Sequence, residues 1–150
     1  MSIAVRLPDD SLRQLPEGAT GTDLAAGIGP RLLEAALAIK QDGVLSDLKA
    51  PLRDGARIES VTAKSEESLE LIRHSTAHLL AHAVKRLFPN AKVGIGPVIE
   101  DGFYYDFQVE KPFTPEDLAV IEAEMRKIVS EGVEVVREDL DRDEAVARFG

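Results

Sequence analysis

The segment Arg73-His74-Ser75-Thr76-Ala77-His78-Leu79-Leu80-Ala81-His82 contains all three histidines of this 150-residue chain. The histidines are spaced at i, i+4 and i+8, so on a helix they form one row that drifts by about 40° per step. At about 100° per residue, apolar side chains cluster on the opposite side of the same helix. These side chains are Leu69, Ile72, Thr76, Leu80, Ala83 and Leu87. The segment therefore predicts a long helix with a row of histidines that a ligand can approach.

The predicted helix begins after Ser65, which can cap it, and ends near Leu87, before Pro89-Asn90. No acidic residue occurs from residue 73 to residue 92, although the chain as a whole has a net charge of −9. Basic residues do occur there, at Arg73, Lys85, Arg86 and Lys92. A local cationic region is typical of a site for a phosphate-bearing ligand, whereas the overall charge argues against a protein that coats nucleic acid.

The composition limits the class of protein. Hydrophobic residues make up 44% of the chain, which is enough for a core. Cysteine is absent, which excludes disulfides and thiolate metal sites. No apolar run approaches the roughly 18 residues that span a membrane, and the first residues lack the pattern of a signal peptide. We therefore expect a cytoplasmic protein without membrane association.

Residues 1–62 show the pattern of a small α+β domain. Alternating apolar residues predict a strand at 3–7 and a returning strand at 12–15. Thr22 can cap a short helix that ends at Ile28. A second hairpin is predicted around the turn Asp42-Gly43, and a last strand over residues 57–62. Two hairpins, a helix and a final strand indicate a β-grasp fold.

Residues 63–150 form a second α+β domain built on the histidine helix, with the boundary at Ala63-Lys64-Ser65. A hairpin is expected over residues 92–109, followed by a helix that begins at Thr114-Pro115 and ends at Gly132. The predicted buried stripe of that helix comprises Leu118, Ile121, Met125 and Ile128. A strand at 133–136 and a short helix from Asp141 complete the pattern. The chain stops at Gly150 directly afterwards, which is abrupt for a finished domain.

Histidines at i and i+4 are a familiar pair of metal ligands, because both can point at one ion. A zinc site needs a third or fourth protein ligand, and no cysteine is available. The residues between His74 and His78 also provide no glutamate for a metalloprotease motif. The spacing leaves two interpretations open, a metal-binding pair and a pair that moves protons or hydrogen-bonds a ligand.

Two runs carry a resemblance to a known family. Ile72-Arg73-His74-Ser75-Thr76-Ala77-His78-Leu79-Leu80 and the run from Gly94 to Phe107, GIGPVIEDGFYYDF, are similar to the editing region of bacterial-type threonyl-tRNA synthetases. The second run is the more specific, because alanyl-type editing domains share His-x3-His. Residues 1–62 resemble the TGS domain, a β-grasp module that precedes the editing region in that family.

The resemblance implies the N-terminal region of a threonine–tRNA ligase, an enzyme that attaches threonine to its tRNA with ATP and hydrolyses mischarged seryl-tRNA. It assigns His74 and His78 to catalysis of editing, where they bind the 3′-terminal adenosine and arrange the attacking water. It assigns Gly96 and Tyr105 to substrate binding, with His82 in a supporting role. The family's Cys-x3-His segment and its aminoacylation core are missing, so the chain carries half of an editing site.

The same resemblance implies threonine-specific tRNA as the partner and a homodimeric full-length parent. Zinc, ATP and magnesium are expected for that parent, and no cofactor or metal for this fragment. Two alternatives remain. One is a TGS-type module that binds RNA or protein without catalysis, and the other is a zinc-dependent aminoacyl-tRNA deacylase.

The first prediction concerns zinc. With three histidines on one helix and no cysteine, this chain should bind zinc weakly, if at all, because His82 is about 12 Å along the helix from His74. Metal analysis after dialysis measures this directly. Stoichiometric zinc that is retained by the wild type and lost in His74→Ala would support the zinc-dependent deacylase instead.

Overall fold

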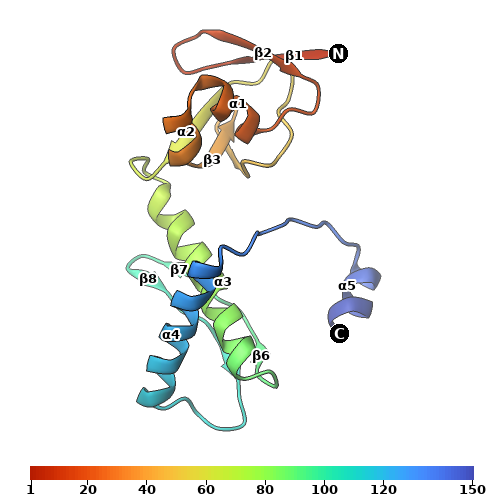
Figure 1. Ribbon diagram of the computed structural model, residues 1–150. Helices are drawn as coiled ribbons and strands as arrows, with labels where there is room; N and C mark the ends of the chain where they lie inside the picture. Colours follow the sequence, from red (N-terminus) through yellow and green to blue (C-terminus); the bar gives the residue numbers. More distant parts are fainter. The chain divides into compact units, whose positions relative to one another are not determined.

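The computed structural model describes all 150 residues and shows five strands and two short helices in the first 62 of them (Figure 1). In chain order these are β1 (Ser2–Arg6), β2 (Leu12–Pro16), α1 (Gly21–Ile28), α2 (Pro30–Ala35), β3 (Ala36–Gln41), β4 (Val44–Ser46) and β5 (Ile58–Thr62). Strand β1 pairs antiparallel with β2, and β3 pairs antiparallel with β4 on one edge and β5 on the other. Both predicted hairpins are confirmed.

The rest of the chain contains three helices and four two-residue strands. They are α3 (Ser68–Leu87), β6 (Lys92–Val93), β7 (Val98–Ile99), β8 (Gly102–Phe103), β9 (Phe107–Gln108), α4 (Pro115–Glu131) and α5 (Arg142–Phe149). This mixture of helices and strands confirms the α+β fold class. None of the helices combines the length and the apolar character needed to cross a membrane.

The chain groups into two compact units. The first comprises residues 1–77 and 96–104, and the second comprises residues 78–95 and 105–150. The division falls within α3, between Ala77 and His78. This division does not test the domain boundary that the sequence predicts between residues 62 and 63, so that boundary stays a prediction.

The second hairpin forms because its turn residues suit it. Asp42 and Gly43 have φ angles of 52° and 81°, and a two-residue hairpin turn of this kind requires positive φ at both positions. The Asp42 carboxylate also accepts a hydrogen bond of 2.8 Å from the backbone N–H of Arg57. The turn is thereby tied to the residue that precedes β5.

The core of the first unit joins both hairpins to α1. Its buried side chains are Ile3, Val5, Leu24, Ile39, Leu52, Ala56 and Ile58. Arg6 at the end of β1 pairs in parallel with Arg57, and its N–H donates to the carbonyl of Ala56 at 2.9 Å. Removal of these apolar side chains from water is the main force that holds the unit together.

Helix α1 is capped by Thr20 and not by Thr22, so that prediction is wrong. The Thr20 hydroxyl accepts from the N–H of Asp23, and the Asp23 carboxylate accepts from the N–H of Thr20 at 2.8 Å. This reciprocal pair is a capping box, which needs an acid three residues after the cap. Thr22 has no such partner, and its hydroxyl instead donates to the carbonyl of Leu48 at 3.3 Å.

Ser65 does not cap α3, which begins at Ser68, two residues later than predicted. The Ser65 hydroxyl accepts from the N–H of Thr62 at 2.9 Å, so it closes a turn directly after β5. The hydroxyl of Ser68 donates back to the carbonyl of Ala63 at 3.1 Å. Lys40 of β3 forms an ion pair with Glu67 and lies 3.4 Å from a carboxylate oxygen of Glu59. These bonds join the sheet to the start of α3 within the first unit.

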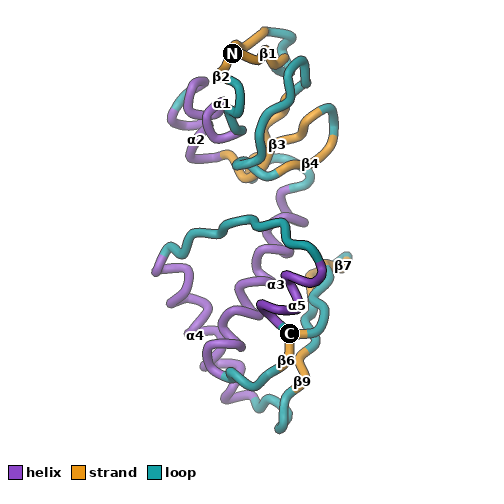
Figure 2. The backbone as a smooth tube through the Cα atoms, turned by 90° about the vertical axis from the view of Figure 1, so that its right-hand side faces the viewer, coloured by secondary structure: helices purple, strands orange, loops and turns teal.

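In the second unit, α4 lies beside the second half of α3 (Figures 1 and 2). The shared core contains the buried residues Ala83, Val84, Ala91, Ile121 and Ile128, with Leu79, Leu80, Leu87, Phe88, Phe107, Val109, Phe113 and Met125 packed around them. The start and end predicted for α4 are confirmed. Thr114 and Asp117 form a capping box, and Gly132 ends the helix at φ 61°.

Two predictions in this region are wrong. Leu118 is 61% exposed and does not belong to the buried stripe of α4, which consists of Ile121 and Ile128 with the half-buried Met125. Residues 133–136 contain no strand. A strand forms only where a second strand supplies hydrogen bonds, which an apolar pattern cannot show. The short helix after Asp141 is confirmed as α5, with Asp141 as its cap.

The ion pair between Lys40 and Glu67 generates a prediction about pH. The hydrogen bond from Lys40 lowers the pKa of Glu67 below its ordinary 4.5, and that bond in turn raises the pKa of Lys40 above 10.5. The stabilisation by Glu67 is therefore fully present above its ordinary pKa and is lost as the pH falls through the lowered value. The stabilisation by Lys40 is present below its ordinary pKa and is lost as the pH rises through the raised value. We expect Glu67→Gln to lower Tm slightly at neutral pH.

In thermal melts, the difference in Tm between Glu67→Gln and the wild type should shrink in acid. Glu66→Gln is the matched control, because it removes the neighbouring exposed carboxylate and leaves the ion pair with Lys40 intact. Equal pH dependence of the two variants would contradict the role given to Glu67.

Candidate functional site

All three histidines lie on α3, and the side chain of each is exposed. The opposite face is buried only in the second half of the helix, where Ala83 and Val84 are 0% and 1% exposed. Leu69 and Ile72 are 53% and 48% exposed, so the first half of the predicted apolar stripe is not covered. Ala77, one of the small residues between the histidines, is itself buried.

The first unit contains His74 and Gly96. Gly96 precedes the short hairpin β7–β8, in which Val98 pairs with Phe103 and Ile99 with Gly102. Arg73, the neighbour of His74, donates from Nη1 to the carbonyl oxygen of Glu100 at 2.8 Å. This bond attaches the turn of the hairpin to the first half of α3.

The second unit contains His78, His82 and Tyr105. The ring of Tyr105 stacks on Phe107, with 4.9 Å between centroids and 18° between planes. Phe107 in turn meets Phe113 edge-on at 6.0 Å. Tyr105 is therefore held by an aromatic cluster that continues into the core.

Tyr105 also lines a surface hollow of about 580 Å³. Its lining consists of Tyr105, Asp106, Phe107, Gln108, Val109, Pro112 and Phe113. The mixture of aromatic rings with backbone and polar side chains suits a flat ligand that stacks and accepts or donates hydrogen bonds.

The backbone beside Tyr105 follows an unusual path. The hairpin expected over residues 92–109 is interrupted, because β6–β9 and β7–β8 are separate two-residue ladders. Between them, the N–H of Gly94 donates to the carbonyl of Asp106 at 2.8 Å, and the N–H of Asp106 donates to the carbonyl of Ile95 at 2.9 Å. A Cβ at position 94 would lie 3.0 Å from the Asp106 carbonyl oxygen, which is tighter than an ordinary contact, so glycine suits this close approach.

One turn after His82, Arg86 forms a charged network between α3 and α4. Arg86 donates to Glu131 at 2.8 Å and contacts Glu124 at 3.2 Å. The hydrogen bond from Arg86 lowers the pKa of Glu131. The network of Arg86 therefore joins α3 to α4 one turn after His82.

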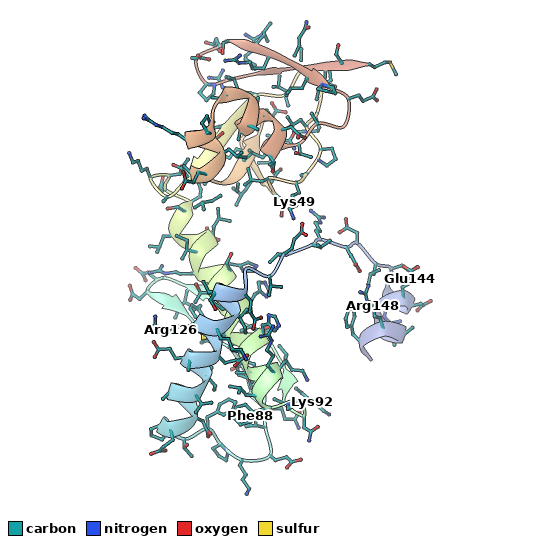
Figure 3. All side chains as sticks on the ribbon, in the orientation of Figure 1. Lys49, Phe88, Lys92, Arg126, Glu144 and Arg148 are labelled. Carbon is teal, nitrogen blue, oxygen red and sulfur yellow. The ribbon has the colours of Figure 1, made fainter.

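The cationic region predicted around α3 is largely engaged in bonds within the protein. Arg86 is paired with two carboxylates of α4. Lys85 donates to the carbonyls of Pro89 and Ala91 at 2.7 and 2.9 Å, which closes the loop between α3 and β6. Phe88 and Lys92 mark this loop in Figure 3. The sequence pattern alone could not reveal these partners, because they depend on how the loop and α4 are placed.

The structure contains no group of three or more histidine, aspartate or glutamate side chains that could hold a metal ion. The candidate residues are His74 and Gly96 in the first unit, and His78, His82 and Tyr105 in the second, where Tyr105 lines the hollow.

Comparison with known sequences identifies the class of domain first. Residues 3–62 match the TGS domain family. This is the stretch that folds into β1 to β5 with α1 and α2, so the TGS resemblance predicted for residues 1–62 is confirmed.

Curated relatives then extend the similarity along almost the whole chain. The threonine–tRNA ligase of Citrifermentans bemidjiense is 58% identical over 147 residues, which are 98% of this chain and 23% of that protein. Those of Pelobacter propionicus and Oceanobacillus iheyensis are 53% and 50% identical over 148 and 147 residues, again 23% of their length. The chain spans about a quarter of the length of these relatives and is similar to their N-terminal region. The predicted resemblance to threonyl-tRNA synthetases is confirmed.

The stacking of Tyr105 on Phe107 generates a prediction about stability. Phe107→Leu keeps an apolar side chain in the core but removes both aromatic contacts, so we expect the free energy of unfolding to fall by about 1 kcal/mol. Urea denaturation measures the loss. Leu118→Ala is the control, because its side chain is exposed on α4 and its removal should change stability by no more than about 0.5 kcal/mol. Equal effects of the two substitutions would contradict the supporting role of Phe107.

Proposed function

We propose that this chain acts as the N-terminal region of a threonine–tRNA ligase, where it contacts tRNA and supplies part of a site that hydrolyses mischarged seryl-tRNA. The observation that carries the proposal is the 50–58% identity to threonine–tRNA ligases over nearly the entire chain, including the histidine helix and the GIGPVIEDGFYYDF run. Relatives this similar usually keep the same chemistry in the corresponding segment.

A hydrolytic site, in addition to the site that attaches the amino acid, is needed for a physical reason. Serine is smaller than threonine by one methyl group, and the difference of one methyl or methylene is worth only about 1–3 kcal/mol in a binding pocket. The site that attaches the amino acid to tRNA therefore cannot exclude serine sufficiently. Hydrolysis of seryl-tRNA at another site completes the discrimination between threonine and serine.

We assign His74 and His78 to the hydrolytic step. They lie on successive turns of α3 and are exposed, so both imidazoles can reach a bound nucleotide. An imidazole can donate a hydrogen bond to a ribose hydroxyl or accept one from a water molecule, and a positioned water can then attack the ester bond. The ester bond breaks, serine leaves, and the tRNA regains its free hydroxyl.

Gly96 and Tyr105 are assigned to substrate binding. Gly96 exposes its backbone close to the β7–β8 hairpin, and Tyr105 presents a ring that Phe107 holds from behind. Such a ring offers a stacking surface for a base. His82 has a supporting role, because it lies on the same helix as His78, one turn further along.

The wider properties of the ligase belong to the same proposal. The full-length enzyme would use ATP and magnesium for activation of threonine, bind zinc outside this chain, act on threonine tRNA, form a homodimer and work in the cytoplasm. This chain contributes no cysteine to a zinc site.

The TGS match favours a second candidate function. Residues 3–62 belong to a compact unit with its own core, so they could bind RNA or protein without any catalysis. In that case the histidines would have no effect on hydrolysis.

A deacylation assay tests the proposal. In a full-length ligase that contains this chain, His74→Ala should abolish most hydrolysis of seryl-tRNA, because water placement is lost, and should leave threonine activation unchanged. Arg126→Ala is the matched surface control, since Arg126 is an exposed residue of α4 whose only ion pair is with Glu122 on the same helix (Figure 3). The isolated chain should hydrolyse seryl-tRNA at least a hundredfold more slowly, because the rest of the pocket is not there to hold the substrate. Normal hydrolysis by His74→Ala would favour the binding module.

A further inference from the structure

The β7–β8 hairpin is too small to be stable by itself. It consists of two residue pairs, Val98 with Phe103 and Ile99 with Gly102. Isolated two-stranded hairpins are marginal in water even when they are longer. Its position must therefore depend on contacts with the rest of the first unit.

Few of these contacts are apolar. Ile99 is 47% exposed, Glu100 and Asp101 at the turn are exposed, and Val98 and Phe103 are only half-buried. Next to the hairpin, the N–H of Tyr104 reaches the carbonyl of Pro97 at 3.4 Å, which is long for a hydrogen bond. Apolar burial alone does not anchor the hairpin firmly.

The bond from Arg73 to Glu100 supplies an anchor of another kind. The guanidinium is 2.8 Å from the Glu100 carbonyl, across 27 residues of sequence. A charged donor to a neutral acceptor makes a stronger hydrogen bond than two neutral groups do. Because the acceptor is a backbone carbonyl, the bond fixes the turn itself and not a mobile side chain.

Arg73 and the hairpin both adjoin residues of the proposed site. His74 follows Arg73 directly on α3, and Gly96 lies two residues before β7. Movement of the hairpin relative to α3 would change the place of the Gly96 backbone with respect to the turn of the helix that bears His74.

We propose that Arg73 is a positioning residue of the editing site, which holds the β7–β8 hairpin on α3 through the Glu100 carbonyl and so fixes the backbone at Gly96. This inference rests on the proposed editing function. It assigns Arg73 no contact with the substrate. The competing role is direct binding of a tRNA phosphate by the guanidinium. In that case, removal of the charge would weaken tRNA binding and make the binding less sensitive to salt.

The anchoring is tested first, in this chain, by hydrogen exchange at the amides of residues 98–103. Arg73→Met should increase exchange there at least tenfold, because methionine keeps the helix but cannot donate. Arg73→Lys should restore part of the protection, since an ammonium can still donate one hydrogen bond. Glu100→Ala is the matched control: it removes the carboxylate and keeps the carbonyl, so protection should be unchanged. Unchanged exchange in Arg73→Met would overturn the proposal.

The role in catalysis is tested next, by seryl-tRNA hydrolysis in the full-length ligase. Arg73→Met should lower kcat by about 10- to 100-fold, as expected for misplacement of about 1 Å, and should change KM less than threefold. Arg73→Lys should recover much of kcat, and threonine activation should be unaffected in both. A raised KM with normal kcat would overturn the proposal in favour of phosphate binding.

The His74→Ala variant separates the two levels of inference. If His74→Ala abolishes hydrolysis and Arg73→Met does not lower kcat, the positioning role is wrong and the proposed function stands. If His74→Ala hydrolyses normally, the proposed function is wrong and the positioning role falls with it, whatever the exchange data show about the anchor.

Discussion

The packing of the second half of α3 against α4 and β9 is the constraint on which the second unit depends. Ala83 and Val84 are almost completely buried, and their short side chains allow close approach of the neighbouring elements. With this face committed to the core, the histidine face of the same helix has to point outward. Larger residues at these two positions would move α4 away and change the surface around His78 and His82.

The interrupted hairpin between α3 and α4 connects this core to the site. Asp106 bonds to the backbone of Gly94 and Ile95, so the chain bends away from regular pairing directly after Tyr105. Phe107 then returns to the ladder with β6 and stacks on Tyr105. Tyr105 lies in this interrupted stretch, and its ring lines the surface hollow.

Charge contributes to order at the site more than to overall stability. Most ion pairs of the chain are exposed, and such pairs contribute about 0–1 kcal/mol each. The bonds of Arg73, Lys85 and Arg86 are different because they connect α3 to a hairpin turn, a loop and a second helix. The bonds of Arg73 and Arg86 join segments that are distant in sequence, and the bonds of Lys85 close the loop that follows α3.

The sequence by itself determined those features that depend on neighbouring residues. The turn at Asp42-Gly43, the capping box at Thr114 and the αL residue Gly132 follow from local backbone preferences, and the structure has all three. The histidine row follows from helical spacing alone. Its chemical role in editing came from resemblance to a family, and no side-chain geometry could be read from the sequence.

Only the tertiary structure decided which of several locally possible patterns was used. Ser65 and Thr22 are both acceptable caps, but each hydroxyl bonds elsewhere. Leu118 fits the helical stripe of α4, but the core does not extend that far. The apolar pattern at residues 133–136 suits a strand, but strand formation needs a pairing segment. Arg73 gave no sign of its partner, because the Glu100 carbonyl is 27 residues away and only folding brings the two atoms together.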